Sequence, residues 1–206
     1  MRAARILLLV MGWVFVFAVG CKKNAVDTTA FKSALNSYYA QQQNCLWSAA
    51  IKFPQQADTS NDEQTKTFDA LTDAGMLVRK SAEKKRFLVG SKQVNDYDLS
   101  DQGRSSWTPD PTQPGYGNFC YGHPQVSAID SFTAADDAGT RYNVTYHYAA
   151  ASPPAWANSA EMKTAFPKLA AETSGQQVAT AVLLKTDTGW QVQNVQAAPM
   201  PPNQMQ

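Results

Sequence analysis

Charged side chains are scarce in this chain, and their signs nearly balance. Lys and Arg number 18 and Asp and Glu 17 among 206 residues, so that charged residues make up 17% and the formal net charge is +1. This balance excludes a basic segment that coats nucleic acid, an acidic solvating chain and most disordered classes. The length allows one domain or two small ones, since domains commonly have about 100 to 150 residues.

Recognised catalytic motifs are also missing from the sequence. It has no Gly-x-Ser-x-Gly, no His-Glu-x-x-His and no glycine-rich phosphate loop. Its two histidines are His123 and His147, and Cys120-x-x-His123 has the spacing of two metal ligands. A structural zinc site needs four ligands, however, and no second Cys or His pair lies nearby. We therefore expect no metal and no cofactor, and the sequence specifies no catalytic constellation, which favours a protein that is not an enzyme.

The first twenty residues have the pattern of an export signal. Arg2 and Arg5 precede an apolar run from Ile6 to Val19 that contains no acidic residue. The run has about fourteen residues, whereas a membrane-spanning helix needs roughly twenty. We therefore predict a signal peptide over residues 1–20 that is cleaved on export.

The signal ends in Ala18-Val19-Gly20-Cys21, which resembles the lipobox of bacterial lipoproteins. The resemblance covers the signal segment alone, and alanine stands where the family usually has leucine. It implies that Cys21 becomes the lipid-modified first residue of the mature protein, carrying diacylglycerol and an acyl chain such as palmitate. Several acyl chains hold a protein firmly on a bilayer. Lys22 follows where inner-membrane retention favours aspartate, so the resemblance implies the outer membrane, facing the periplasm.

Two cysteines remain once Cys21 is assigned to lipid. Cys45 and Cys120 are an even pair in an oxidising compartment, so a disulfide between them is the economical prediction. Such a bond closes a loop of about 75 residues and is typically worth about 2 to 4 kcal/mol. Two free thiols are the alternative, and Cys120 activated by His123 would then suit a cell-wall or thiol-dependent hydrolase.

Hydrophobic periodicity predicts two helices early in the mature chain. The i, i+4, i+7 spacing of Phe31, Leu35 and Tyr38 indicates a first helix over about residues 30–42. A second helix is expected from Asn61 or Asp62 to Gly75, with Phe68 on its inner face. We expect Phe31 and Phe68 to share one small core.

The segment from about residue 61 to 107 resembles a winged-helix domain. The motifs that carry the resemblance are a helix ending in Leu71-x-x-Ala74-Gly75-Met76-Leu77 and a hairpin closing on Tyr97-x-Leu99-Ser100-x-x-Gly103. In DNA-binding members of that family the helix enters the major groove. Here the helix carries Asp62, Glu63, Asp69 and Asp73 against the single base Lys66, which would repel phosphates. We therefore expect no DNA-binding character and no nucleic-acid partner.

The hairpin of this segment has an excess of positive charge. Seven basic and four acidic side chains lie between Met76 and Trp107. Such a surface could contact anionic lipid headgroups or a cell-wall polymer. The simpler interpretation is a solvated hairpin whose charges protect its edges from aggregation.

Proline and glycine mark a boundary after this hairpin, and the residues beyond it follow the period of strands. Alternation through Tyr142, Val144 and Tyr146 predicts a half-buried strand, and the later part of the chain reads as two strands, a helical segment and two more strands. The expected organisation is a signal peptide at 1–20, a lipidated tether at 21–29, a helical part with a hairpin at 30–107, a Pro/Gly linker at 108–118, an antiparallel sheet part at 119–196 and a disordered tail at 197–206.

The predicted fold class is α+β. A helical, winged-helix-like N-terminal half would pack on a small antiparallel ββ-α-ββ C-terminal half. Aromatic residues crowd the boundary between these halves, namely Trp107, Tyr116, Phe119 and Tyr121. Exposed rings in a cleft could stack on sugars or hold a peptide, and the alternative is that they are core.

The sequence thus predicts a lipid-anchored protein of the bacterial envelope that is a non-enzymatic binding or scaffolding module. The membrane, through the lipid, and an envelope protein or cell-wall polymer are its expected partners. The hydrolase that uses Cys120 and His123 is the alternative.

Overall fold

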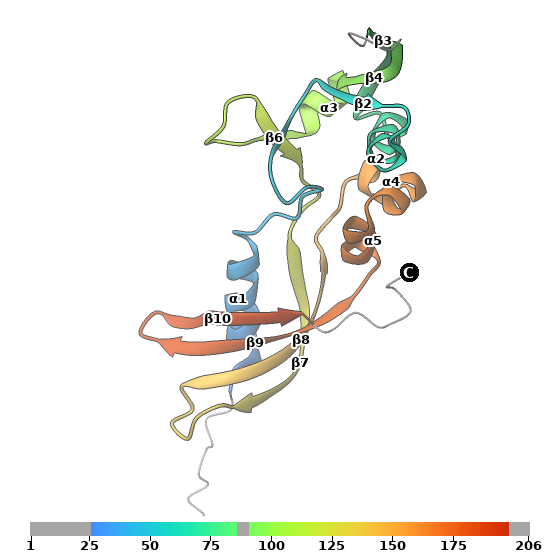
Figure 1. Ribbon diagram of the computed structural model, residues 1–206. Helices are drawn as coiled ribbons and strands as arrows, with labels where there is room; N and C mark the ends of the chain where they lie inside the picture. The colour runs from blue at the N-terminus through green and yellow to red at the C-terminus, as the bar shows by residue number, and fades with distance from the viewer. Residues whose placement is uncertain (1–25, 86–90, 198–206) are drawn as a thin grey trace, which may run out of the picture.

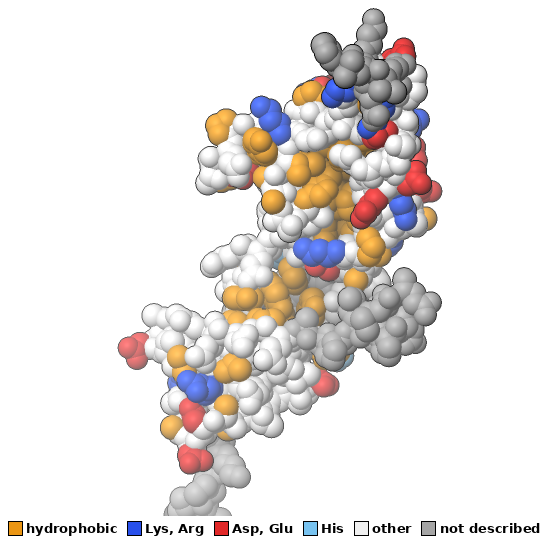
Figure 2. All heavy atoms as spheres, viewed as in Figure 1, with side chains coloured by type: hydrophobic (Ala, Val, Ile, Leu, Met, Phe, Trp, Pro, Cys, Tyr) orange, Lys and Arg blue, Asp and Glu red, His pale blue; other side chains and the backbone are white. Residues whose placement is uncertain are grey.

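A computed structural model describes residues 26–85 and 91–197 of the chain. These residues form two lobes joined by a narrower middle region (Figure 1). Each lobe has its own cluster of buried hydrophobic side chains. Figure 2 shows hydrophobic side chains gathered where the lobes meet and in a hollow of the upper lobe.

The lower lobe, called the sheet lobe here, is one helix on a four-stranded antiparallel sheet of order β10-β9-β8-β7. Its elements are α1 (Thr28–Tyr39), β7 (Pro124–Ala134), β8 (Arg141–Ala150), β9 (Gln177–Thr186) and β10 (Gly189–Ala197). The buried face of α1 carries Phe31, Leu35 and Tyr39, a spacing of four residues that keeps them on one side of a helix. They pack on alternate residues of the strands, such as Val144 and Tyr146 of β8.

The upper lobe, called the mixed lobe here, contains two three-stranded antiparallel sheets and a group of helices. The sheet of order β1-β6-β5 is made of β1 (Ile51–Lys52), β6 (Tyr116–Phe119) and β5 (Trp107–Pro109). The sheet of order β2-β4-β3 is made of β2 (Gln55–Asp58), β4 (Ser91–Leu99) and β3 (Leu77–Lys85). The helices are α2 (Asp62–Asp73), α3 (Asp101–Ser106), the 3-10 helix η1 (Ala155–Asn158), α4 (Ala160–Ala165) and α5 (Pro167–Thr173).

The motif that ends in Ser100 and Gly103 fixes the junction between α2, β4 and α3. The Ser100 hydroxyl accepts a hydrogen bond of 2.8 Å from the Gly103 amide, which caps α3, and donates one of 2.5 Å to the Gly75 carbonyl. A Cβ atom at Gly103 would overlap the carbonyl oxygen of Met76. Glycine is therefore required at position 103 by close backbone approach.

An acidic residue of α2 has a structural partner on each neighbouring strand. Asp69 accepts hydrogen bonds from Tyr97 of β4 at 2.8 Å and from Arg79 of β3 at 2.7 Å. Tyr97 is fully buried, and burial followed by its bond to Asp69 raises the pKa of its phenol. This acid of α2 thus holds the helix to the hairpin.

Neither lobe is a continuous piece of chain. The mixed lobe consists of two insertions into the sheet lobe, one between α1 and β7 and one between β8 and β9. The chain therefore passes four times between the lobes. We call these four crossing segments, residues 40–50, 120–123, 151–154 and 174–176, the neck.

The predicted fold class is wrong. The described structure is mostly β, with 43% strand and 29% helix in three antiparallel sheets, and it is not a helical half packed on a small ββ-α-ββ half. The polar stretch Gln55–Asp58, which lies in the part predicted to be helical with a hairpin, is a strand that pairs with β4 over four residues. The helix Thr28–Tyr39 packs on the sheet of the C-terminal part, so Phe31 and Phe68 lie in different cores. Alternation of apolar and polar residues identifies a strand in a sequence only where one face of the strand is buried. The edge strand Gln55–Asp58 is short and shows too little of this alternation to be predicted.

Candidate functional site

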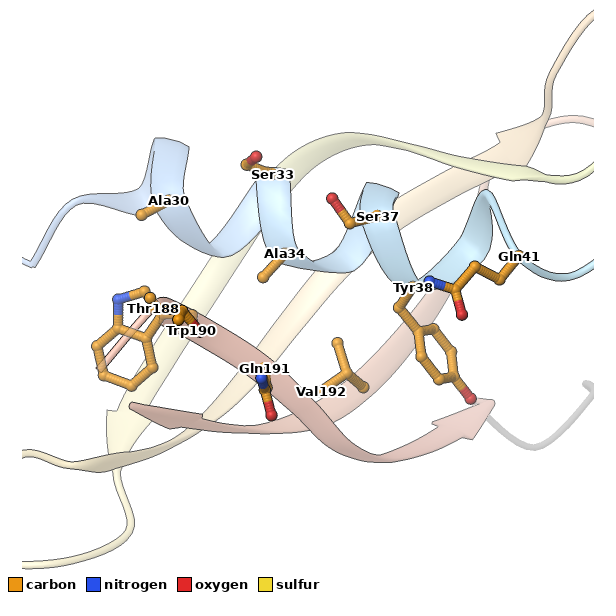
Figure 3. A pocket seen from close by; sticks show the side chains of 11 residues that line it. Ala30, Ser33, Ala34, Ser37, Tyr38, Gln41, Thr188, Trp190, Gln191 and Val192 are labelled. Carbon is orange, nitrogen blue, oxygen red and sulfur yellow. The ribbon is translucent and has the colours of Figure 1, made fainter. Parts of the chain in front are cut away.

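A groove of about 600 Å³ runs along the sheet lobe between α1 and β10 (Figure 3). On the helix side it is lined by small side chains at helical spacing, Ala30, Ser33, Ala34 and Ser37. This face of α1 lies beside the face that buries Phe31 and Leu35. Longer side chains at these positions would fill the space between α1 and β10. Because the side chains present are short, that space stays open.

The strand side of the groove is formed by the start of β10. Thr188, Gly189, Trp190, Gln191 and Val192 line it, and Tyr38 and Gln41 lie toward its other end. The ring centroid of Trp190 lies 4.9 Å from that of Phe31 in an edge-on contact. The indole is thereby fixed as a rigid apolar wall.

One wall of the groove is also an edge of the sheet. Within the described residues, β10 pairs on one side with β9 and has no strand on its other side. The backbone N–H and C=O groups on an edge of this kind can pair with an added strand. Strand β10 is bulged between Val192 and Asn194.

The lining of the groove is polar but uncharged. Hydroxyl groups of Ser33, Ser37 and Tyr38 and the amide of Gln41 supply hydrogen-bond donors and acceptors. Small, apolar and neutral polar groups beside a free strand edge fit an extended polypeptide segment. The lining holds none of the Asp, Glu or His side chains used for acid–base chemistry.

The four aromatic residues predicted as binding residues do not meet in one groove. Phe119 and Tyr121 are fully buried, and Trp107 packs edge-on against Phe119 with centroids 4.9 Å apart. Tyr116 is 37% exposed. Phe119 and Tyr121 lie two residues apart on β6 and its extension and so face the same side, whereas Tyr116 faces the opposite side. Trp107 comes from β5, so three of the four rings belong to the core of the mixed lobe or pack on it.

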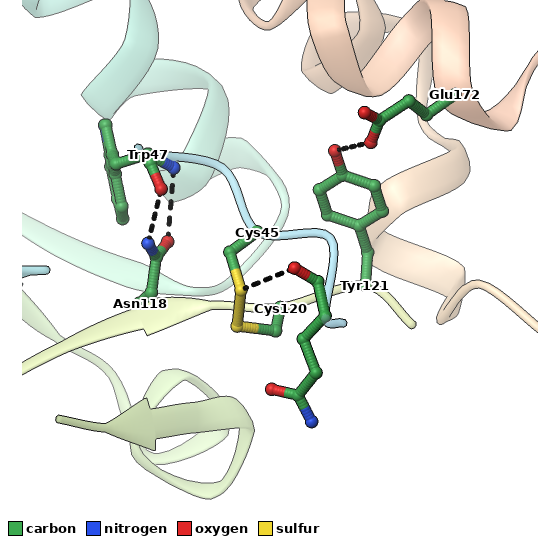
Figure 4. Close-up of a disulfide and its surroundings, with 7 residues drawn as sticks. Cys45, Trp47, Asn118, Cys120, Tyr121 and Glu172 are labelled. Carbon is green, nitrogen blue, oxygen red and sulfur yellow. Dashed lines mark hydrogen bonds between the residues drawn. A yellow bond between two sulfur atoms is a disulfide. The ribbon is translucent and has the colours of Figure 1, made fainter. Parts of the chain in front are cut away.

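The predicted disulfide between Cys45 and Cys120 is confirmed (Figure 4). It joins two of the four neck segments, which run antiparallel to each other. The amides of Leu46 and Tyr121 donate hydrogen bonds of 3.0 and 2.8 Å to the carbonyls of Phe119 and Asn44. The bond therefore closes a short ladder between the incoming and outgoing chain of the first insertion.

Asn118, at the end of β6 just before the neck, fastens this strand to the first neck segment beside the disulfide. Its side-chain amide donates to the carbonyl of Trp47 at 2.7 Å, and its side-chain oxygen accepts from the Trp47 amide at 3.2 Å (Figure 4). A side chain that satisfies both backbone groups of a residue acts as one more rung of the ladder. The neck is thus held by covalent and polar contacts together.

The alternative nucleophilic pair is not assembled here. The sulfur of Cys120 is bonded to Cys45, and a thiolate is the form of cysteine that attacks a substrate. The His123 carbonyl accepts a hydrogen bond of 2.9 Å from Ala151, another neck residue. His147 lies on β8, 4.0 Å from Asp130 of β7. In residues 26–85 and 91–197, no three Asp, Glu, His or Cys side chains are grouped as metal ligands.

A buried phenol links the neck to the second insertion. Tyr121 donates a short hydrogen bond to Glu172 of α5 (Figure 4). Burial, followed by this bond to Glu172, raises the pKa of Tyr121 well above its usual range. The phenol is therefore neutral at physiological pH and serves as a donor that ties α5 to the neck.

Three of the seven basic side chains of the predicted basic hairpin form ion pairs, among them Arg79 with Asp69. Lys92 forms an ion pair with Asp58 of β2, and Arg104 lies 3.7 Å from Asp98. Lys84 donates to the side chain of Gln56 at 3.2 Å. These partners favour the interpretation of a solvated, edge-protecting hairpin, and its tip at 86–90 lies outside the described residues.

A second hollow, of about 360 Å³, lies between α2 and α4 in the mixed lobe. Its lining includes three alanines and the charged residues Lys66, Asp73 and Glu161. Asp69, which also lines it, is already bonded to Tyr97 and Arg79. The groove beside β10 is larger and adjoins free backbone groups, so it is the stronger candidate.

The predicted lipid site Cys21 and the signal lie outside the described residues. Among the helices that are described, none is long and apolar enough to span a bilayer.

Comparison with protein-family models, curated proteins and solved structures finds no match in any of the three. The resemblances to lipoprotein signals and to winged-helix domains therefore stay predictions. The groove was missed at the sequence level, although its signal is present. Small residues recur at helical spacing in α1, and β10 alternates without any charge.

Proposed function

We propose that this chain is a lipid-anchored bacterial envelope protein and acts as a non-enzymatic binding module through the groove between α1 and β10. The lipobox that ends in Cys21 supports the anchor. The Cys45–Cys120 disulfide supports an oxidising compartment, since such bonds persist outside the cytosol. The outer membrane, facing the periplasm, is the location that the residue after Cys21 favours.

The observation that carries the binding proposal is the open strand edge beside the groove. An extended segment that pairs with β10 gains backbone hydrogen bonds, and its alternate side chains enter the space beside Ser33 and Ser37. Trp190 and Val192 supply the apolar contact. An uncharged wall favours an uncharged segment, because unpaired charge is costly to desolvate.

Lipid attachment is tested by labelling growing cells with a clickable fatty acid. Wild-type protein should take the label and fractionate with membranes, and Cys21→Ser should lose both properties. Recovery of processed Cys21→Ser protein with membranes at high salt would show that lipid is not the anchor.

Use of the groove is tested by placing a photo-crosslinking amino acid at exposed positions of the sheet lobe. Adducts should form in cells from Ser33 and Ser37, and Ser37→Trp, which fills the groove, should suppress the adduct from Ser33. Ser131 on β7, the opposite edge strand, is the matched control and should give none. Equal adducts at Ser33 and Ser131 would contradict a specific groove.

Counting free thiols distinguishes the proposed binding module from the hydrolase alternative. Denatured, unreduced protein should show no titratable thiol from Cys45 or Cys120. Two titratable thiols would remove the disulfide and restore the Cys120–His123 pair.

A further inference from the structure

The edge strand β10 has a sequence that reads nearly the same in both directions. Residues 191–196 are Gln-Val-Gln-Asn-Val-Gln, with the centre of symmetry between Gln193 and Asn194. In an antiparallel pair of two such strands about this centre, Gln191 faces Gln196 and Val192 faces Val195. Every residue then meets one of its own kind, except that Gln193 faces Asn194.

Because of the bulge, the symmetry of the sequence also holds for the face of the sheet on which the side chains lie. In a regular strand Val192 and Val195 would point to opposite faces, because side chains alternate with a period of two. The register shift between Val192 and Asn194 places Val192 opposite Leu183 and Val195 opposite Ala181. Leu183 and Ala181 are both buried in the core under α1, so both valines lie on the α1 side of the sheet.

The two edges of the sheet differ in protection. Edge strand β7 begins at Pro124 and carries Asp130, and proline and charge are features that block strand addition. Strand β10 has no charged residue and no proline from Gly189 to Ala197, and its exposed side chains are amides. A like strand therefore meets no charge repulsion at this edge.

The groove provides the space that a second strand needs on the α1 side. Side chains of an added strand that lie level with Val192 project toward Ala30, Ser33 and Ala34 of α1. These small residues leave about 600 Å³ there. The apolar valines of the added strand thus enter the groove, and its glutamines lie on the other face of the sheet.

We propose that β10 pairs antiparallel with β10 of a second copy of this chain, which joins the two four-stranded sheets into one continuous sheet. The proposal names the occupant of the groove and so rests on the proposed binding surface, but not on the lipid anchor. The interface is isologous, because each copy offers the same strand.

The first test is a charge exchange across the two-fold axis, measured by analytical ultracentrifugation of the full chain carrying Cys21→Ser. In Gln191→Lys/Gln196→Lys each lysine faces a lysine, and self-association should weaken at least about tenfold and recover with salt. In Gln191→Lys/Gln196→Glu each lysine faces a glutamate, and the dimer should persist. Gln125→Lys/Ser131→Lys on β7 is the matched control and should have no effect.

The second test is cysteine trapping in cells, with two differently tagged copies of the lipid-anchored protein. Gln191→Cys in one copy and Gln196→Cys in the other should form a mixed disulfide. Gln191→Cys in both copies should not, because the two positions are separated by roughly 16 Å along the strands.

A monomeric wild-type protein in the centrifuge overturns the proposal, and so does a dimer that responds equally to the β7 and β10 changes. A 191–191 disulfide in place of 191–196 also overturns it, since it requires another register. If the Gln196→Cys variant is monomeric and its introduced thiol forms a disulfide with a different protein, the edge of β10 binds another partner. This result likewise overturns self-pairing. If Cys21→Ser shows that the lipid anchor is absent while the charge exchange behaves as stated, the anchor fails and self-pairing stands.

Discussion

The hydroxyl groups of Tyr39 and Tyr146 lie 2.8 Å apart inside the sheet lobe, although 107 residues separate them in the chain. Tyr39 is the last residue of α1, and Tyr146 is a fully buried residue in the middle of β8. Two phenols that satisfy each other allow this end of the helix to rest on the sheet without leaving a polar group unpaired. Tyr39 also stacks on Tyr148, with ring centroids 5.9 Å apart.

Removing one of these hydroxyls should destabilise the protein because the other is then buried without its hydrogen-bond partner. Tyr39→Phe leaves the buried Tyr146 hydroxyl without a partner, which costs about 1 to 3 kcal/mol. The double variant Tyr39→Phe/Tyr146→Phe should lose less than the sum of the two single variants, because no unpaired group remains. Urea denaturation measures the three free energies, and strict additivity would contradict the pairing.

Alkaline pH should unfold the protein through its buried phenols. Burial, followed by the bond with Tyr39, raises the pKa of Tyr146, and burial followed by Glu172 raises that of Tyr121. The folded state disfavours phenolate, so the stabilisation is fully present below the unfolded pKa of about 10 and is lost as pH rises above it. The midpoint temperature of thermal unfolding should decrease as the pH rises from about 10 to 11, and tyrosinate absorbance should appear over the same range. A flat midpoint across that range would rule this out.

Loss of the disulfide should loosen the neck before it loosens either core. We expect Cys45→Ser/Cys120→Ser to lower the free energy of unfolding by about 2 to 4 kcal/mol, since the closed loop spans 75 residues. Amide exchange should rise first at Leu46 and Tyr121, whose amides form the ladder beside the bond. The sheet around Tyr146 should keep its protection. Equal acceleration there would mean that the lobes unfold as one unit.

Glycine at position 103 should be intolerant of a methyl group. A Cβ there would meet the Met76 carbonyl, which is backbone and cannot rotate away, so Gly103→Ala should cost about 1 to 3 kcal/mol. Ser105→Ala on the exposed side of the same short helix is the control and should change stability by less than about 0.5 kcal/mol. Similar midpoints for the two variants in chemical denaturation would refute the packing argument.

Local features of the chain were predictable from sequence, and spatial ones were not. The helix at Thr28–Tyr39, the Cys45–Cys120 pair and the alternation in β8 each follow from spacing or from counting. The spatial partner of that helix does not, because the apolar face of Phe31 and Leu35 would fit any core. It packs on strands that begin more than 80 residues later, and periodicity carries no information about such contacts.

The candidate site shows the same limit. From sequence, the aromatic residues at the boundary fit either a binding surface or a core, and Phe119 and Tyr121 are buried, as large rings in a small lobe usually are. The groove arises where small residues of α1 lie beside an edge strand. Strand order decides which strand becomes an edge, and it cannot be read from the strand itself.

The placement of α1 on the last strands has a consequence for folding. The ribosome makes a chain from its N-terminus, so Phe31 and Leu35 exist long before β9 and β10, whose residues help to cover them. Until those strands are made, the apolar face of this helix stays exposed, and the long sequence separation makes its burial slow. The sheet lobe can therefore close only after the C-terminal strands have been synthesised.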